Sequence, residues 1–245
     1  MLYHCSDIIA AEGECIMNDK LHIYHGSEKI IRAPQYGGGR KHNDYGPGFY
    51  CTEIRDLAAE WACTPFGDGF VNHYTLDMSM LRTLDLNSEE YSILNWIAVL
   101  VSNRLVGNGT AIAGRAKKYL KEHFYVNVDA YDVIRGYRAD DAYYDFADAF
   151  LNNTITVEQL ARAMRLGKLG EQIVLKSQLA FDSISFEGFE TAASDTFYPL
   201  RKARSNTAER EYRTICEEET DGLYMIDIIR GGVTNDDARI PRNIP

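Results

Sequence analysis

Apolar and polar positions alternate along several short segments before residue 90, which is the period of a β-strand with one buried face. The alternation predicts a strand over 20–27 (KLHIYHGS) and a longer one over 69–78 (GFVNHYTLDM). GFYCT at 48–52 predicts a short strand, and LRTLDL at 81–86 is expected to continue the same sheet. The Gly-rich, polar segment 33–48 predicts a long loop after the first strand.

Apolar residues three and four positions apart predict the helices. Thr52 is the expected N-cap of a helix over 53–63. Ser88 is the expected cap of a long apolar helix over 89–105, which the glycines of 107–109 would end.

The second half of the chain combines both periods. A strand is predicted over 131–139, and one or two strands over 171–186. Thr156 and Gln159 have the spacing of a capping box that opens a helix ending at Arg165. The other expected helices cover 111–124, 140–152 and 201–220.

The predicted strands fall into two groups, before 87 and after 130, with a mostly helical block between them. This order favours an α+β fold over a regular βαβ alternation. We expect an N-terminal arm at 1–20 and a single domain at 21–228 with a helical insertion at about 88–166. A loosely ordered tail is expected at 229–245.

Composition narrows the class of protein. The chain has 245 residues, enough for a sizeable core, and a net charge of −10. Such an acidic chain is unlike a non-specific nucleic-acid binder, which needs a basic surface. The five cysteines show no CxxC spacing, and we expect free thiols in a reducing cytoplasm. No apolar run is long enough for a membrane span, and the N-terminus lacks the pattern of a signal peptide.

The tripeptide His25-Gly26-Ser27 ends the first predicted strand. A glycine there lets a ligand approach the backbone, and His25 and Ser27 can hydrogen-bond to hydroxyl groups. The alternative is a buried histidine followed by a turn glycine. A similar LYHCS lies around His4, but it has Cys in place of Gly, so we expect the site at His25 and not at His4.

Two further segments carry candidate chemistry. Tyr50 follows the glycines of GPGFYCT, and Trp61 lies on the next predicted helix, so their rings could enclose a flat heteroaromatic group. The alternative for Trp61 is packing in the core. Glu171 opens an apolar strand in GEQIVLKS, where a carboxylate is either a solvated edge residue or a functional acid.

The motifs IYHGS, GPGFYCT and GEQIVLKS resemble, in order and spacing, those of the H-Y-E class of ADP-ribosyltransferases. This class includes poly(ADP-ribose) polymerases and diphtheria toxin. The resemblance extends over about 21–186 of the chain. The chain is also similar to an uncharacterised bacterial family of that superfamily, with the pattern YHGS…NDYGxGFYxT…LGEQxVLKS. The resemblance implies a split antiparallel β-sheet core around an NAD cleft.

The resemblance also implies roles for individual residues. His25 would bind the adenosine-side ribose of NAD+, Gly26 the nicotinamide amide, and Ser27 would assist at the ribose. Tyr50 and Trp61 would enclose the nicotinamide ring. Glu171 would bind the nicotinamide ribose and stabilise the developing oxocarbenium cation, as an anion does in glycoside hydrolysis. No metal is implied.

Six further residues are assigned from their positions. Arg32 and Arg40 are candidates for the NAD+ diphosphate, with a mobile surface loop as the alternative around Arg40. Asp44 lies in the NDYG pattern and is expected to anchor the loop beside the cofactor. Asp140, Asp141 and Tyr144 either face the acceptor or, for the two aspartates, cap a helix.

The sequence departs from the resembled class at two positions. The small hydroxyl residue that contacts the nicotinamide amide falls at Ala58, and Leu169 stands two residues before Glu171. An acid or amide at that second position characterises the arginine-modifying R-S-E toxins, so Leu169 and His25 argue against that class. Long-chain polymerisation is not implied.

The resemblance thus predicts a cytoplasmic mono-ADP-ribosyltransferase that uses NAD+ as co-substrate. The acidic charge favours a protein acceptor over nucleic acid. Small bacterial members of such families are often toxins or conflict-system effectors with a neutralising antitoxin partner, which the resemblance therefore implies as well. The alternatives are an NAD+ glycohydrolase and a non-catalytic NAD- or ADP-ribose-binding module.

Overall fold

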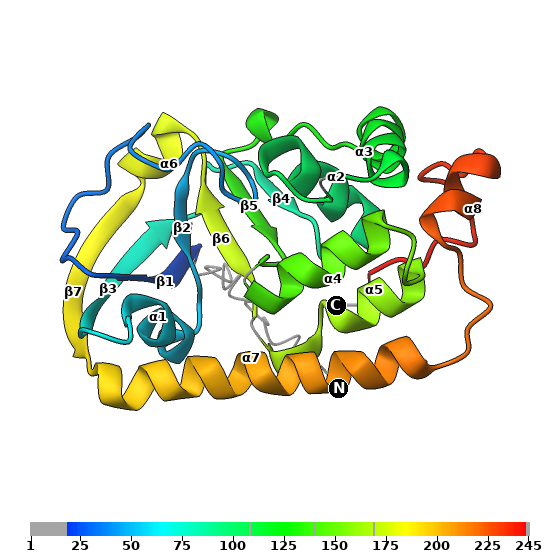
Figure 1. Ribbon diagram of the computed structural model, residues 1–245. Helices are drawn as coiled ribbons and strands as arrows, with labels where there is room; N and C mark the ends of the chain where they lie inside the picture. The colour runs from blue at the N-terminus through cyan, green and yellow to red at the C-terminus, as the bar shows by residue number, and fades with distance from the viewer. Residues whose placement is uncertain (1–18, 108, 140, 169, 244–245) are drawn as a thin grey trace, which may run out of the picture.

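A computed structural model describes residues 19–107, 109–139, 141–168 and 170–243. It has an α+β fold with two separate sheets (Figure 1). The predicted arm at 1–20 lies almost wholly outside the described residues. Within the described residues, no helix is long and apolar enough to cross a membrane.

The first sheet has three antiparallel strands in the order β1-β3-β7: β1 (Lys20–Ser27), β3 (Gly69–Asp77) and β7 (Ile184–Ala192). The second sheet has four strands in the order β2-β6-β5-β4, and only the β4–β5 pair is parallel. Its strands are β2 (Phe49–Cys51), β6 (Gln172–Leu175), β5 (Val133–Gly136) and β4 (Thr83–Asp85).

One two-way backbone bridge joins the sheets. Tyr24 N donates to Thr52 O at 2.8 Å, and Thr52 N donates to Tyr24 O at 3.0 Å. Between the sheets lies a cluster of buried apolar side chains that includes Ile23, Phe49 and Tyr74. The bridge and this cluster fix the end of β1 beside the start of β2.

Helices cover both sheets (Figure 1). α1 packs against β1 and β3, whereas α2 to α5 lie on the side of the four-stranded sheet around a core that contains Trp96. The long α7 runs past both groups and contacts α1, α4 and α5. The helices are α1 (Arg55–Ala62), α2 (Ile93–Asn103), α3 (Ala111–His123), α4 (Asp141–Leu151), α5 (Val157–Ala163), α6 (Gln178–Asp182), α7 (Ser194–Glu217) and α8 (Met225–Arg230), with 3-10 turns η1 (Val128–Ala130) and η2 (Leu166–Lys168).

Many of the predicted elements are confirmed. β1, β2, β3 and α3 lie where the periodicity predicts them. The capping box at Thr156 is present, because its hydroxyl accepts from Gln159 N while the Gln159 side chain accepts from Thr156 N. The three described cysteines, Cys51, Cys63 and Cys216, are free thiols.

Both predicted caps of the first helices are wrong. Thr52 is tied into the bridge to Tyr24, so α1 begins only at Arg55. α2 is capped by Ser92, which forms a capping box with Asn95, instead of by Ser88. That helix ends at Asn103, before the glycines of 107–109.

Three larger expectations also need correction. The segment 81–86 forms β4 in the other sheet, where it pairs with β5. β5 confirms the strand predicted over 131–139, but its place in the sheet shows that 88–166 is not a purely helical insertion. The tail at 229–243 is packed: Ile240 is buried, and Asn243 N and Nδ2 donate to Tyr91 O and Leu86 O.

Candidate functional site

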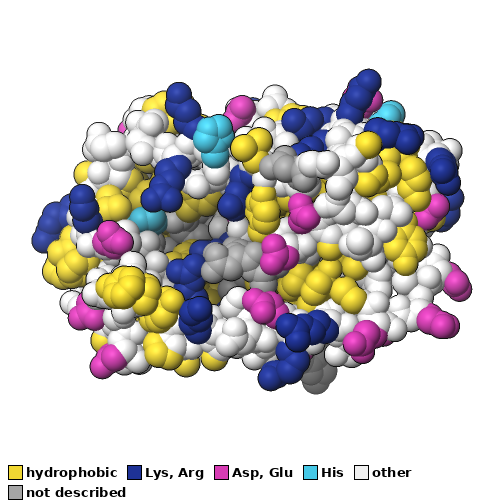
Figure 2. All heavy atoms as spheres, in the orientation of Figure 1, with side chains coloured by type: hydrophobic (Ala, Val, Ile, Leu, Met, Phe, Trp, Pro, Cys, Tyr) yellow, Lys and Arg dark blue, Asp and Glu magenta, His cyan; other side chains and the backbone are white. Residues whose placement is uncertain are grey.

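The candidate site lies where the two sheets meet. β1 carries His25, β2 carries Tyr50, and Glu171 immediately precedes β6. β2 and β6 are neighbours, with Tyr50 opposite Val174. Figure 2 shows the surface hollowed in front of the ends of β1 and β2, with Lys, Arg and His side chains on the rim. The fold therefore brings the three predicted catalytic positions to one region.

His25 is held by the neighbouring strand. Its Nδ1 lies 2.7 Å from Tyr50 O, and its ring stacks on Phe49 with the ring centroids 4.4 Å apart. A carbonyl can only accept, so Nδ1 carries the proton and Nε2 is left as an acceptor. Burial of the imidazole lowers the pKa of His25, which keeps the ring neutral near pH 7. A neutral Nε2 can accept a hydrogen bond from a hydroxyl group.

Gly26 is required by the packing of α1. A Cβ atom at this position would lie 1.9 Å from Ala58 O in the backbone of α1. The absence of a side chain therefore lets α1 lie directly on β1. This contact explains the glycine of the HGS motif by packing, and Ala58 itself is fully buried.

The segment after Gly26 is organised by Asn72 of β3, which is fully buried. Its Nδ2 donates to Ser27 Oγ at 3.1 Å and to Lys29 O at 3.2 Å, and its Oδ1 accepts from Ile31 N at 2.7 Å. The Ser27 hydroxyl donates to Lys29 O at 2.6 Å. One buried amide thus fixes the turn that carries Ser27.

Tyr50 is fixed by the Gly-rich loop. Its hydroxyl donates to Gly46 O at 2.6 Å and accepts from Tyr45 N at 3.1 Å. Burial raises the pKa of the Tyr50 hydroxyl far above its usual range. The phenol is therefore neutral, and its two hydrogen bonds fix the orientation of the Tyr50 ring.

Trp61, near the end of α1, carries a cation on its ring. The Arg138 guanidinium lies over the indole, 3.6 Å from the ring centroid. Arg138 follows β5, so a residue next to the four-stranded sheet lies on the ring of Trp61 in α1. The indole ring of Trp61 therefore already contacts one planar cation within the protein.

Glu171 is held by two donors. Its Oε1 accepts from Asn87 Nδ2 at 2.9 Å, and its Oε2 accepts from Arg135 Nε at 3.2 Å. Arg135 also forms an ion pair with Glu53 through Nη2. The Glu171 side chain is 36% exposed, so the carboxylate is oriented by the protein and still reaches solvent.

The turn before Glu171 is fastened to two helices. Gly170 has φ of +64°, a conformation that favours glycine, and it lies against the side chains of Ile54 and Leu57 in the α1 region. Arg204 of α7 donates to Gly167 O at 2.6 Å and forms a bidentate pair with the buried Glu60 of α1. α7 therefore supports the turn from which Glu171 projects.

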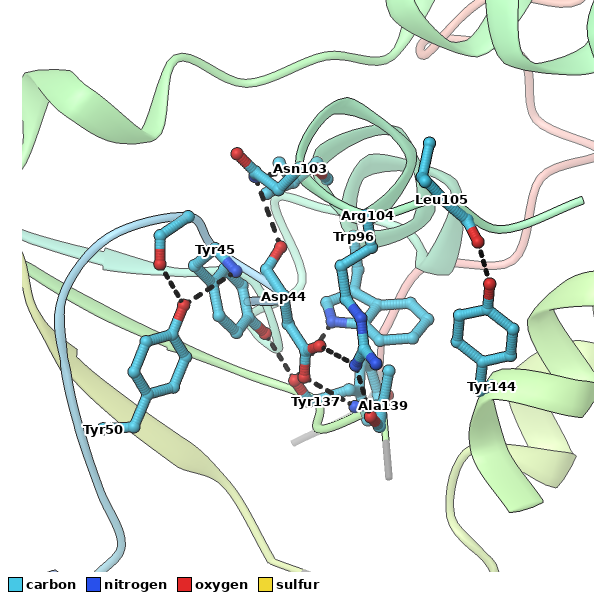
Figure 3. Close-up of polar contacts among 12 residues, drawn as sticks. Asp44, Tyr45, Tyr50, Trp96, Asn103, Arg104, Leu105, Tyr137, Ala139 and Tyr144 are labelled. Atoms are coloured by element: carbon cyan, nitrogen blue, oxygen red, sulfur yellow. Dashed lines mark hydrogen bonds and ion pairs between the residues drawn. The ribbon is translucent and has the colours of Figure 1, made fainter. Parts of the chain in front are cut away.

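Asp44 is a buried anchor of the loop (Figure 3). Its carboxylate pairs with Arg104 at 2.6 Å and accepts from Ala139 N at 2.9 Å. Asn103 Nδ2 donates to Asp44 O at 3.3 Å. Burial raises the pKa of Asp44, although these donors oppose the shift. Both carboxylate oxygens of Asp44 accept hydrogen bonds from within the protein, as expected for an anchor of the loop. A direct contact of Asp44 with a cofactor stays a prediction.

Two other predicted residues, Arg32 and Tyr144, make contacts outside the three motifs. Arg32 is exposed, and its guanidinium lies 5.3 Å from the ring centroid of Phe186 and 5.9 Å from that of Phe189, both on β7. Tyr144 on α4 donates to Leu105 O. Asp140 and Leu169 lie outside the described residues.

Four site residues carry no motif in the sequence: Asn72, Asn87, Arg135 and Arg138. Each reaches the site only through pairing between strands that are distant in the chain. Asn72 offers the one available signal, because it is an amide at a position where the alternation of β3 predicts a buried side chain. Among the described residues, no group of three or more His, Cys, Asp or Glu side chains could hold a metal ion.

Comparison with known proteins gives one match. The model of a family described as "Protein of unknown function (DUF3990)" matches residues 21–186, which run from β1 into β7 and include His25, Tyr50 and Glu171. No curated protein and no solved structure matches the chain. Since the match covers more than half of the chain, the protein belongs to the DUF3990 family.

Proposed function

We propose that this protein is a mono-ADP-ribosyltransferase that cleaves NAD+ and transfers ADP-ribose to a macromolecular acceptor. One observation carries the proposal: the three motifs that resemble the H-Y-E class meet at the junction of two sheets, with His25, Tyr50 and Glu171 at its centre. The two sheets, joined at Tyr24 and Thr52, would be the split core of such an enzyme around an NAD cleft.

The residues around the cleft fit the parts of NAD+. The neutral His25 offers Nε2 as an acceptor for a ribose hydroxyl, and Ser27 lies on the same fixed turn. The nicotinamide ring of NAD+ is a planar cation, and the Trp61 face already carries the planar cation of Arg138. Nicotinamide would take the place of this guanidinium on Trp61, and the resemblance to the H-Y-E class assigns Tyr50 to the other face of the nicotinamide ring.

The reaction follows from the charges. The bond between nicotinamide and C1′ of the ribose breaks, and its electron pair leaves with nicotinamide, which becomes neutral. Positive charge develops on the ribose, and the Glu171 carboxylate stabilises it. The acceptor then forms a bond to C1′ with its lone pair and loses a proton to solvent. Asn87 and Arg135 hold the carboxylate in place, so little reorganisation is needed.

The acceptor is proposed to be a protein. The chain has a net charge of −10, which opposes the approach of a nucleic-acid phosphate backbone. An NAD+ glycohydrolase remains the second candidate, since Glu171 keeps contact with solvent and water could replace the acceptor.

A labelling experiment tests the transfer. NAD+ labelled in its adenylate part is incubated with the full chain alone, with cell lysate, or with purified nucleic acid. We expect label on protein in the lysate, and a loss of roughly 10²–10³-fold for Glu171→Gln. The control is Glu187→Gln, which removes an exposed carboxylate on β7 and leaves labelling unchanged. Label on nucleic acid alone contradicts the proposed acceptor, and free ADP-ribose without any labelled acceptor favours the glycohydrolase.

A further inference from the structure

Arg135 lies between two carboxylates. Its Nε is 3.2 Å from Glu171 Oε2, and its Nη2 forms an ion pair with Glu53 Oε2. Only 27% of the Arg135 side chain is exposed, against 40% for Glu53 and 36% for Glu171. The guanidinium is therefore the more enclosed member of a three-residue cluster that opens towards solvent through its two acids.

The strand order explains how the three side chains meet. β6 lies between β2 and β5 in the four-stranded sheet. Glu53 follows the end of β2, and Glu171 precedes the start of the antiparallel β6. Arg135 on β5 pairs with Ile173 of β6 and reaches the same edge. The bridge between Thr52 and Tyr24 fixes the backbone beside Glu53.

This arrangement affects how much negative charge Glu171 presents to the substrate in the proposed reaction. A guanidinium favours a bidentate pair with a single carboxylate, with two parallel N–H···O bonds. Such a pair with Glu171 would offset the negative charge that faces the developing ribose cation. In the structure Glu53 binds Nη2, so Glu171 receives only Nε. One guanidinium and two carboxylates leave a net charge of −1 on the cluster.

We propose that Glu53 is a positioning residue, which holds Arg135 away from a bidentate pair with Glu171 and so keeps the Glu171 carboxylate available to the substrate. This inference rests on the proposed function, because it assigns Glu53 a part in the same site. Arg135 and Asn87 then orient Glu171, while Glu53 controls how strongly Arg135 binds it.

Kinetics of nicotinamide release provide the test. For Glu53→Gln we expect kcat to fall roughly tenfold to a hundredfold, because Arg135 moves onto Glu171. KM for NAD+ is expected to stay within about twofold, since Glu53 does not contact the cofactor. In an Arg135→Gln background the same change at Glu53 is expected to alter kcat by less than about twofold. Glu187→Gln is the matched control and leaves both constants unchanged.

Two results would overturn the inference. An unchanged kcat in Glu53→Gln contradicts it, and so does an equal loss in the presence and absence of Arg135, which would mean that Glu53 acts independently of the guanidinium. A crystal structure of Glu53→Gln gives a readout that does not need activity. We expect Arg135 to contact Glu171 through both Nε and Nη2, and a retained single contact contradicts the inference.

The two proposals fail in different ways. A wild-type protein that releases no nicotinamide contradicts the proposed function and the catalytic part of this inference, while the crystal structure still decides whether Glu53 restrains Arg135. An active wild-type protein whose Glu53→Gln variant is equally active contradicts only the role of Glu53.

Discussion

At the residue scale, contacts from a neighbouring strand fix the tautomer and the orientation of His25. The carbonyl of Tyr50 fixes the proton on Nδ1, and Phe49 covers the ring. Both contacts come from β2, the first strand of the other sheet. A change in the junction between the sheets would therefore alter the tautomer and the orientation of His25 together.

The titration of His25 predicts an acid-sensitive fold. Burial lowers the pKa of His25 in the folded protein, so below the ordinary histidine pKa of about 6.5 the unfolded chain binds a proton that the folded chain does not. The free energy of unfolding should therefore be constant with respect to His25 above about pH 6.5. It should decrease as the pH falls below that value, by at most about 1.4 kcal/mol per pH unit.

Denaturant unfolding between about pH 5 and pH 8 measures this effect. We expect His25→Gln to be less acid-sensitive than the wild type, because glutamine does not titrate. Its stability curve should have a smaller slope below about pH 6.5. Parallel curves for the two proteins would mean that His25 does not carry the predicted proton linkage.

At the scale of elements, the contact between α1 and β1 fixes the position of α1 beside His25 and Gly26. α1 carries Trp61 and begins a few residues after β2, and its backbone at Ala58 touches β1 at Gly26. The ion pair between the buried Glu60 and the partly exposed Arg204 ties the same helix to α7. α1 therefore links the three-stranded sheet to α7 and to the turn before Glu171.

The substitution Gly26→Ala tests this packing. The new Cβ would lie 1.9 Å from Ala58 O, and because this oxygen belongs to the backbone, α1 must shift. We expect a loss of about 1–3 kcal/mol in the free energy of unfolding. Gly114→Ala on α3 is the matched control, since its Cβ meets open space, and it should stabilise the helix by roughly 0.5–1 kcal/mol. Thermal or denaturant unfolding measures both, and a Gly26→Ala protein as stable as the wild type would contradict the account.

At the scale of the whole molecule, the sequence predicts elements better than their partners. Strand alternation located β3, and the capping box located α5, because both signals are local. Local signals failed where long-range pairing competes: Thr52 has the residue type of an N-cap but is held by a bridge to Tyr24. The tail lacks periodicity, yet the side chain of Asn243 packs against the distant Leu86.

The same limit applies to the candidate site. His25, Tyr50 and Glu171 could be predicted from the sequence because each belongs to a short motif. Arg135 could not be predicted as a site residue, because it reaches Glu171 only through the pairing of β5 with β6, which no local pattern encodes. Arg138 similarly meets Trp61 only in the assembled fold.

The release of nicotinamide from NAD+ is the measurement that tests the central claim most directly. Purified wild-type protein and Glu171→Gln are compared at equal concentration, with and without lysate as a source of acceptor. The account predicts release by the wild type that is strongest with acceptor, and a rate lower by roughly 10²–10³-fold in the variant. Equal rates in the two proteins, or no release by the wild type under either condition, would contradict it.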